Sequence, residues 1–120
     1  LAFDVDENGT FSNKRELYSF GPGRGIDGMT LDTEGNIYAT AGTKEKCGIY
    51  IFSPEGKQLA LVKLPADPTN CVFGGGAGNL LYITAGIPRK PGEGSKFGLY
   101  RIALKKAGYH VVPLGTNPKR

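Results

Sequence analysis

Three features that define large classes of protein are scarce in this chain of 120 residues, and each absence excludes a kind of function. Its two cysteines, Cys47 and Cys71, are too few for a disulfide framework and lack the spacing of a metal-binding motif. We expect both to be small buried hydrophobes, although a single bridge between them stays open. The one histidine, His110, has no identifiable serine or cysteine partner, which argues against a catalytic triad. Because no apolar run approaches the ~18 residues that span a bilayer, we expect no membrane segment.

The positive charge of the chain is scattered rather than gathered into a stripe. The formal net charge is +4 and the isoelectric point is near 9.1, but the basic residues are not interleaved with aromatic ones. This distribution argues against a nucleic-acid partner. The compartment is unknown from the sequence, although the lack of a disulfide pattern weakly favours a reducing interior such as the cytoplasm.

Glycine, by contrast, is abundant. Nineteen glycines and eight prolines predict many tight turns, and the Tyr, Phe, Val and Ile residues between them favour strands. The turn sequences DENGT, DTEGN and SPEGK place Gly9, Gly35 and Gly56 where a positive φ is wanted. The length suits one small domain. The chain opens inside a strand pattern without an initiator methionine, so we expect further residues before it.

An internal repeat organises the chain. The sequences GNIYATAG and NLLYITAG begin 44 residues apart, at 35 and 79, and DGMTLD and NCVFGG begin 43 residues apart, at Asp27 and Asn70. A hairpin pattern follows each copy, and a third such hairpin stands at the start of the chain. Four antiparallel strands recurring at about 40 to 50 residues are typical of a β-propeller blade.

The repeat therefore predicts an all-β fold, a partial β-propeller domain over residues 1–120. We expect an outer hairpin at 1–20, one blade at 25–65 and another at 69–115, which amounts to roughly two and a half to three four-stranded blades. Propellers usually close their ring with about four to eight blades. The ring must therefore be completed by a missing N-terminal half or by further copies of the chain, as a homo-oligomer.

The motifs D-G-M, D-x-x-G-N, F-G-G and L-Y-x-T-A occur here in order, and together the chain resembles the C-terminal half of the SMP-30/gluconolactonase, or regucalcin-like, family. The resemblance implies a six-bladed propeller and the hydrolysis of sugar lactones or related esters. It also implies a divalent metal, Ca²⁺ or Zn²⁺, held near the channel axis by a Glu, an Asn and an Asp. The Asp matches Asp27; the family's Glu and Asn ligands have no counterpart in these residues.

For Asp27 the resemblance implies a metal ligand in metal-assisted hydrolysis, in which it is also the candidate catalytic base. The two roles compete for the same lone pairs. The other interpretation of Asp27 is a turn in which its carboxylate accepts a backbone N–H at the start of a strand. Asn70 occupies the equivalent position of the next blade, so we expect it to bind substrate, although hydrogen bonding at the strand start would also explain it.

The Pro- and Gly-rich loop at residues 85–96 is expected to border the mouth of the propeller. Arg89 and Lys90 could contact an anionic substrate there, or the loop could simply be solvated.

Three functions stay open at this point. The first is a lactonase-type hydrolase whose small-molecule substrate is a lactone or an ester. The second is a non-catalytic binding or scaffold module. The third is a propeller of the paraoxonase or strictosidine-synthase type, which would share the architecture and change the substrate.

Overall fold

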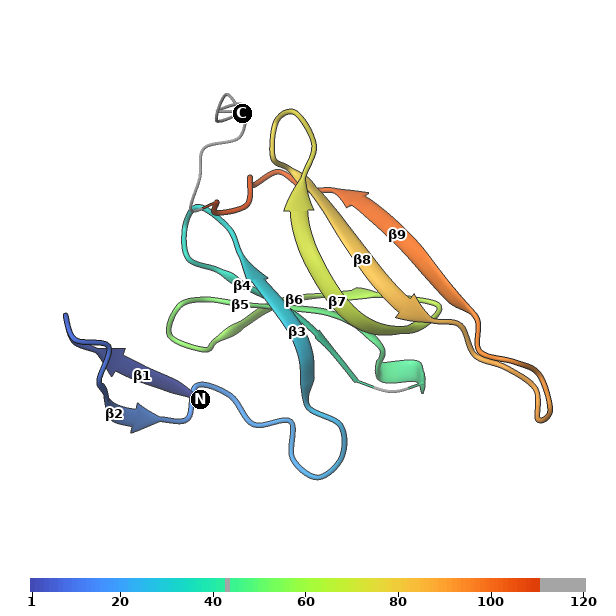
Figure 1. Ribbon diagram of the computed structural model, residues 1–120, viewed down its shortest axis with the longest axis horizontal. Coiled ribbons are helices and arrows are strands. Elements are labelled where there is room, and N and C mark those ends of the chain that lie inside the picture. The colour runs from blue at the N-terminus through green and yellow to red at the C-terminus, as the bar shows by residue number, and fades with distance from the viewer. Residues whose placement is uncertain (43, 111–120) are drawn as a thin grey trace.

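The computed structural model describes residues 1–42 and 44–110, which form nine strands and one short 3₁₀ helix (Figure 1). In chain order the elements are β1 (Ala2–Val5), β2 (Phe11–Arg15), β3 (Ile26–Leu31), β4 (Ile37–Ala41), η1 (Lys44–Lys46), β5 (Gly48–Phe52), β6 (Gln58–Lys63), β7 (Asp67–Gly74), β8 (Leu80–Gly86) and β9 (Phe97–Ala103). The all-β prediction is confirmed. Within the described part of the chain, no helix has the length and apolar character that crossing a membrane takes.

The strands form three antiparallel sheets whose spatial order follows the chain (Figure 1). β1 and β2 make a separate hairpin, β3 to β6 make a four-stranded sheet, and β7 to β9 make a three-stranded sheet. The two larger sheets lie side by side, with β7 against β3 and β4. The strand predicted to complete the last blade extends to residue 115 and lies largely outside the described residues.

Tight turns form where the glycine pattern predicted them. Gly9, Gly35 and Gly56 have φ angles of 80°, 82° and 88°, a region that side chains disfavour. Gly56 is doubly constrained, because a Cβ there would lie 2.2 Å from the carbonyl oxygen of Leu17. The β5–β6 turn is therefore packed against the segment that leads from the hairpin to β3.

The main core fills the space between the two larger sheets. Its buried members are Tyr38, Ile49, Cys71, Phe73, Leu81 and Ile83. The rings of Tyr38 and Phe73 meet edge to face, with centroids 5.0 Å apart, so one aromatic pair joins the sheets. Fully burying side chains of this size is worth about 1.5–3 kcal/mol each.

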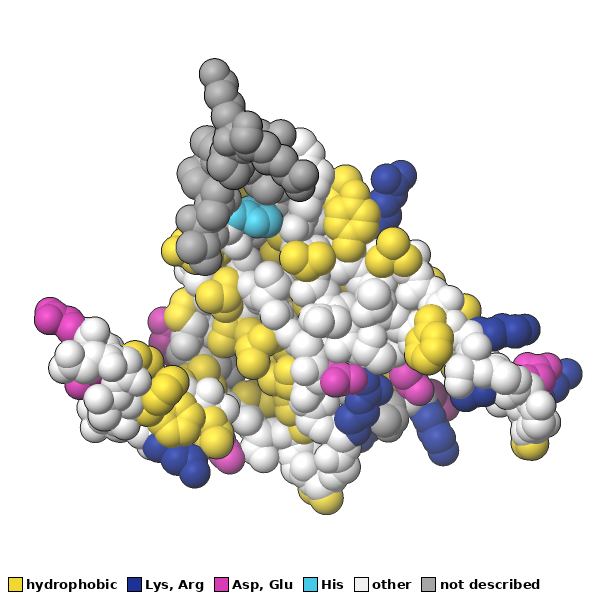
Figure 2. Space-filling view, in the orientation of Figure 1, with side chains coloured by type: hydrophobic (Ala, Val, Ile, Leu, Met, Phe, Trp, Pro, Cys, Tyr) yellow, Lys and Arg dark blue, Asp and Glu magenta, His cyan; other side chains and the backbone are white. Residues whose placement is uncertain are grey.

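A second core covers the opposite face of the four-stranded sheet. Ala39, Ala41, Tyr50 and Phe52 are buried there beneath Phe20. β4 is consequently buried on both faces. The outer face of the three-stranded sheet differs, because Val72, Phe97 and Leu99 are exposed on it. Hydrophobic side chains also reach the surface in several patches on the face of the molecule seen in Figure 2.

Candidate functional site

The start of β3 carries Asp27 in a β-bulge. Ile26 pairs with Ala41 and Met29 with Ala39, so three steps along β3 face two steps along β4. A bulge of this kind redirects a side chain, and bulges are common beside functional sites. The side chain of Asp27 is 48% exposed to solvent. The carboxylate therefore lies at the end of the sheet with access to solvent.

Arg24 holds the Asp27 carboxylate and also ties the two sheets together. Its Nη2 lies 2.6 Å from Asp27 Oδ2 and donates to the carbonyl oxygen of Pro68, on β7, at 2.7 Å. Its Nη1 makes a longer bond of 3.5 Å to the carbonyl oxygen of Gly42. Among the hydrogen bonds of the described residues, Asp27 is thus bound by a guanidinium rather than by the backbone amide that a simple turn would provide.

Asn70 lies directly beside the bulge. A Cβ placed on Gly28 would be 2.3 Å from Asn70 Oδ1, so β3 and β7 approach closely at this point. Asn70 Oδ1 also accepts a bond of 2.8 Å from the backbone N–H of Cys71. The hydrogen bonding expected at a strand start is therefore present, and the amide Nδ2 remains as a donor.

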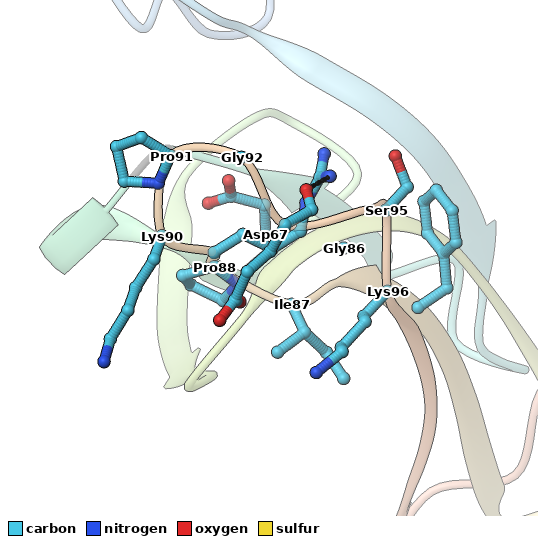
Figure 3. A pocket seen from close by; sticks show the side chains of 12 residues that line it. Asp67, Gly86, Ile87, Pro88, Lys90, Pro91, Gly92, Ser95 and Lys96 are labelled. Carbon is cyan, nitrogen blue, oxygen red and sulfur yellow. Dashed lines mark hydrogen bonds between the residues drawn. The ribbon is translucent and has the colours of Figure 1, made fainter.

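Arg89 lies in a separate pocket made by the β8–β9 loop. The loop folds back over Asp67 (Figure 3). The open pocket between them has a volume of about 550 Å³. Arg89 Nη1 donates to the carbonyl oxygen of Glu93 at 2.6 Å, within the same loop. Asp67 pairs with Gly86, so the loop that follows Gly86 leaves the sheet at the end where β7 begins.

All three predicted residues consequently lie at one end of the two sheets. Gly28 meets Asn70 near the strand starts, which sets β3 and β7 side by side with their starts at the same end. The structure places Asp27 and Asn70 on neighbouring strands, where Asn70 contacts Gly28, the residue that follows Asp27. Arg89 is at the same end but on a loop, with its guanidinium directed to a loop carbonyl.

The cysteines near this end are not built as nucleophiles. Both thiols are free and buried, so no bridge joins them. Burial raises the pKa of Cys71 to about 11. Burial, together with a hydrogen bond from Cys47 Sγ to Asp67 Oδ1 at 2.7 Å, raises the pKa of Cys47 to about 11 as well. Such thiols stay protonated at neutral pH and are unreactive.

The donor set at this end fits part of a metal site. Ca²⁺ favours several carboxylate and amide oxygens, and this end supplies the Asp27 carboxylate on β3 and the Asn70 amide on β7. The described residues hold no group of three or more His, Cys, Asp or Glu side chains that could bind a metal. Further oxygen ligands would therefore have to come from elsewhere in a completed propeller.

Two residues of this site were missed by the sequence analysis. Arg24 lies in the loop sequence GPGRG, where no hydrophobic periodicity marks it. Its role depends on a hydrogen bond to the carbonyl oxygen of Pro68 in the neighbouring sheet. Thr40 is an ordinary strand residue in the sequence, yet its buried hydroxyl bonds the backbone of Gly28 at the bulge.

Comparison with known proteins identifies the family of this chain. Residues 1–87 match the SMP-30/gluconolactonase/LRE-like region. The chain belongs to this family. Regucalcin from Xenopus laevis is 36% identical over 118 residues, covering 85% of this chain and 38% of regucalcin. A gluconolactonase from Zymomonas mobilis is 35% identical over 92 residues, covering 69% of this chain and 24% of that enzyme. The chain thus spans well under half the length of either relative.

Two solved structures of the family share its fold. One, assigned as a gluconolactonase, superposes with a TM-score of 0.70 at 26% identity, covering 90% of this chain and 32% of that protein. A luciferin-regenerating enzyme superposes with a TM-score of 0.71 at 28% identity, covering 89% of this chain and 38% of the enzyme. The prediction of a partial β-propeller is confirmed.

Proposed function

We propose that this chain forms part of a metal-dependent hydrolase of sugar lactones or related esters, with Asp27 as a ligand of its divalent cation, Ca²⁺ or Zn²⁺. The observation that carries the proposal is the half-exposed Asp27 carboxylate, aimed by a bulge at the end of the sheet and lying beside the Asn70 strand. Membership of a family that includes gluconolactonase supports the substrate class.

Asp27 and Arg24 have different roles in the proposed site: Asp27 binds the cation, and Arg24 pairs with one oxygen of its carboxylate. When bound, the cation would polarise the lactone carbonyl and lower the pKa of a bound water. The bond to Arg24 occupies Oδ2 of Asp27 and leaves Oδ1 for the cation. In this arrangement Asp27 binds through one oxygen, and its role as ligand takes precedence over a role as base.

Asn70 and Arg89 are proposed to bind the substrate. Asn70 Oδ1 is engaged by its own strand, so Nδ2 is the group that donates to a lactone oxygen. A guanidinium has five N–H donors. The bond from Arg89 to Glu93 leaves donors for an anionic group, such as the carboxylate released when a lactone opens.

The ring around the site is proposed to be closed by further copies of this chain or by residues outside it. Light scattering of the purified chain, with Zn²⁺ or Ca²⁺ and again with a chelator, distinguishes the two. A dimer or trimer that dissociates in chelator supports closure by copies around a shared cation. A monomer that is indifferent to the cation contradicts that form of assembly.

The proposed metal site is tested by calorimetric titration of Ca²⁺ and Zn²⁺ into the wild-type chain and two variants. Asp27→Asn should weaken binding at least about tenfold, because it removes a charged ligand. Asp4→Asn is the matched control, since Asp4 is an exposed aspartate paired with Arg15 at 2.7 Å, and it should bind like the wild type. Equal binding by Asp27→Asn and the wild type would contradict the proposal.

A non-catalytic binding module is the second candidate, favoured by the lack of a three-residue metal cluster in the described residues. Hydrolysis assays in the assembled propeller separate the candidates. Turnover of sugar lactones that is lost in Asp27→Asn supports the hydrolase. Preference for aryl esters over lactones would indicate a paraoxonase-like propeller, and no turnover of either, with no cation bound, would leave the binding module.

A further inference from the structure

The bulge that carries Asp27 is fastened by one hydroxyl group. Thr40 lies opposite the bulge on β4 and is completely buried. Its Oγ1 accepts a bond from the backbone N–H of Gly28 at 2.8 Å and donates to the carbonyl oxygen of Gly28 at 3.0 Å. A bulged residue loses its regular ladder partners, and a buried backbone group without a partner is costly. The Thr40 hydroxyl bonds both the N–H and the C=O of Gly28.

Gly28 is also confined from the other side. The space that its Cβ would fill is taken by Asn70, whose Oδ1 and Cα would lie 2.3 Å and 2.8 Å from that atom. The backbone at Gly28 is therefore held between the Thr40 hydroxyl of its own sheet and a strand of the next. Because Asp27 directly precedes Gly28, these contacts restrict the directions in which the Asp27 carboxylate can point.

The second repeat provides an internal comparison. β7 also has a register shift near its start, between the pairs Pro68 with Ala85 and Asn70 with Thr84. Thr84 is the equivalent threonine, but it is exposed, and its Oγ1 reaches the Asn70 carbonyl oxygen only at 3.5 Å. It lies closer to the hydroxyl of Thr69, at 2.9 Å. The pair of short hydrogen bonds between a threonine hydroxyl and a bulged residue is therefore found in the repeat that carries the carboxylate.

We propose that Thr40 is a positioning residue that aims the Asp27 carboxylate at a divalent cation, by fixing the backbone of Gly28. This role rests on the proposed function of Asp27 as a metal ligand. It does not require Thr40 to touch the cation or the substrate.

Three variants test the proposal: Thr40→Val, which keeps the shape and removes the hydroxyl, Thr40→Ser, which keeps the hydroxyl, and Thr84→Val, the matched change in the other repeat. Zn²⁺ affinity is measured by calorimetry, and exchange of the Gly28 amide is followed by NMR. Thr40→Val should weaken Zn²⁺ binding about tenfold, an effect typical of groups that orient a ligand. It should also speed exchange at Gly28. Thr40→Ser should restore both properties, and Thr84→Val should change neither.

When the wild-type chain binds Zn²⁺, each other outcome counts against the positioning role. A folded Thr40→Val variant with wild-type Zn²⁺ affinity overturns it. Equal weakening by Thr84→Val would mean that the loss reflects general stability, and it also overturns the proposal.

If the wild-type chain itself binds no Zn²⁺, the proposed metal function fails, and a crystal structure of Thr40→Val then decides the positioning separately. A displaced Asp27 carboxylate that no longer pairs with Arg24 supports the role of Thr40. A 2.6 Å ion pair kept as in the wild type contradicts it.

Discussion

The two repeats of this chain have the same arrangement of their first three strands and differ in the residue near the start of the first one. Each begins with a strand that has a register shift near its start, opposite a threonine of the next strand. At that start the first repeat has Asp27 paired with Arg24, and the second has Asn70 bonded to its own backbone. The comparison shows that the repeat supplies a common geometry, and that the residue at one position differs: a carboxylate bonded to a guanidinium in the first repeat and an amide bonded to its own strand in the second.

The repeats also differ in the turn between their first two strands. In the first repeat the nearly inaccessible Asp32 accepts bonds from the backbone N–H groups of Glu34 and Asn36, from the Asn36 amide and from the Tyr38 hydroxyl. In the second repeat the equivalent position is Gly75, with a φ of 82°. One turn is held by a carboxylate and the other by glycine.

The largest loss of stability is expected from removing the Asp32 carboxylate, which holds the turn of the first repeat. Asp32→Ala leaves four donors without their acceptor, and we expect it to lower the free energy of unfolding by about 4 kcal/mol. In the second repeat Asn79 makes one side-chain bond, to the Leu104 carbonyl oxygen, and Asn79→Ala should cost only about 1 kcal/mol. Urea unfolding of both variants measures the difference. Equal losses would show that the two turns are held alike.

The same carboxylate makes stability depend on pH. Burial acts to raise the pKa of Asp32, but the hydrogen bonds from Asn36, Glu34 and Tyr38 outweigh it and hold that pKa below its ordinary value. Because the folded pKa is lower than the unfolded one, the stabilisation is fully present above about pH 4. It should be lost as the pH falls through the folded pKa. Thermal unfolding across this range should show a weaker acid dependence in Asp32→Asn than in the wild type.

The next largest loss of stability is expected from crowding the close contact between the two repeats. Gly28→Ala would press a methyl group into Asn70, including its Cα, and should destabilise the chain by about 3 kcal/mol. Gly25→Ala is the control, because a Cβ at Gly25 meets no atom within 4 Å. A Gly28→Ala variant as stable as Gly25→Ala would mean that β3 and β7 are farther apart than described.

The smallest effect on stability is expected at Arg24, which pairs with Asp27 in its own repeat and bonds the Pro68 carbonyl oxygen of the next. Arg24→Gln loses the pair with Asp27 and the bond to the Pro68 carbonyl oxygen, and should cost about 1.5 kcal/mol. Arg15→Gln removes an exposed pair within the first hairpin and should leave the unfolding midpoint unchanged. Similar midpoints for both variants would contradict a tethering role for Arg24.

The sequence predicted the described strands of both repeats because their alternation and glycine turns are local signals. It also predicted that Asp27 and Asn70 hold equivalent positions, since the repeat offset alone sets that relation. It could not predict the bond from Arg24 to Pro68, because a long side chain crossing between sheets depends on tertiary packing. The role of Thr40 was hidden for a similar reason: a threonine in a strand is ordinary until the register shows a bulge opposite it.

We propose above that the start of β3 presents Asp27 to a divalent cation beside the Asn70 strand. The most direct test is a crystal structure of the protein soaked in Zn²⁺, with anomalous data collected at the zinc edge. Zinc bound at the proposed site should give a peak about 2.0–2.2 Å from a carboxylate oxygen of Asp27. The absence of a peak at Asp27, with zinc bound elsewhere or not at all, would contradict it.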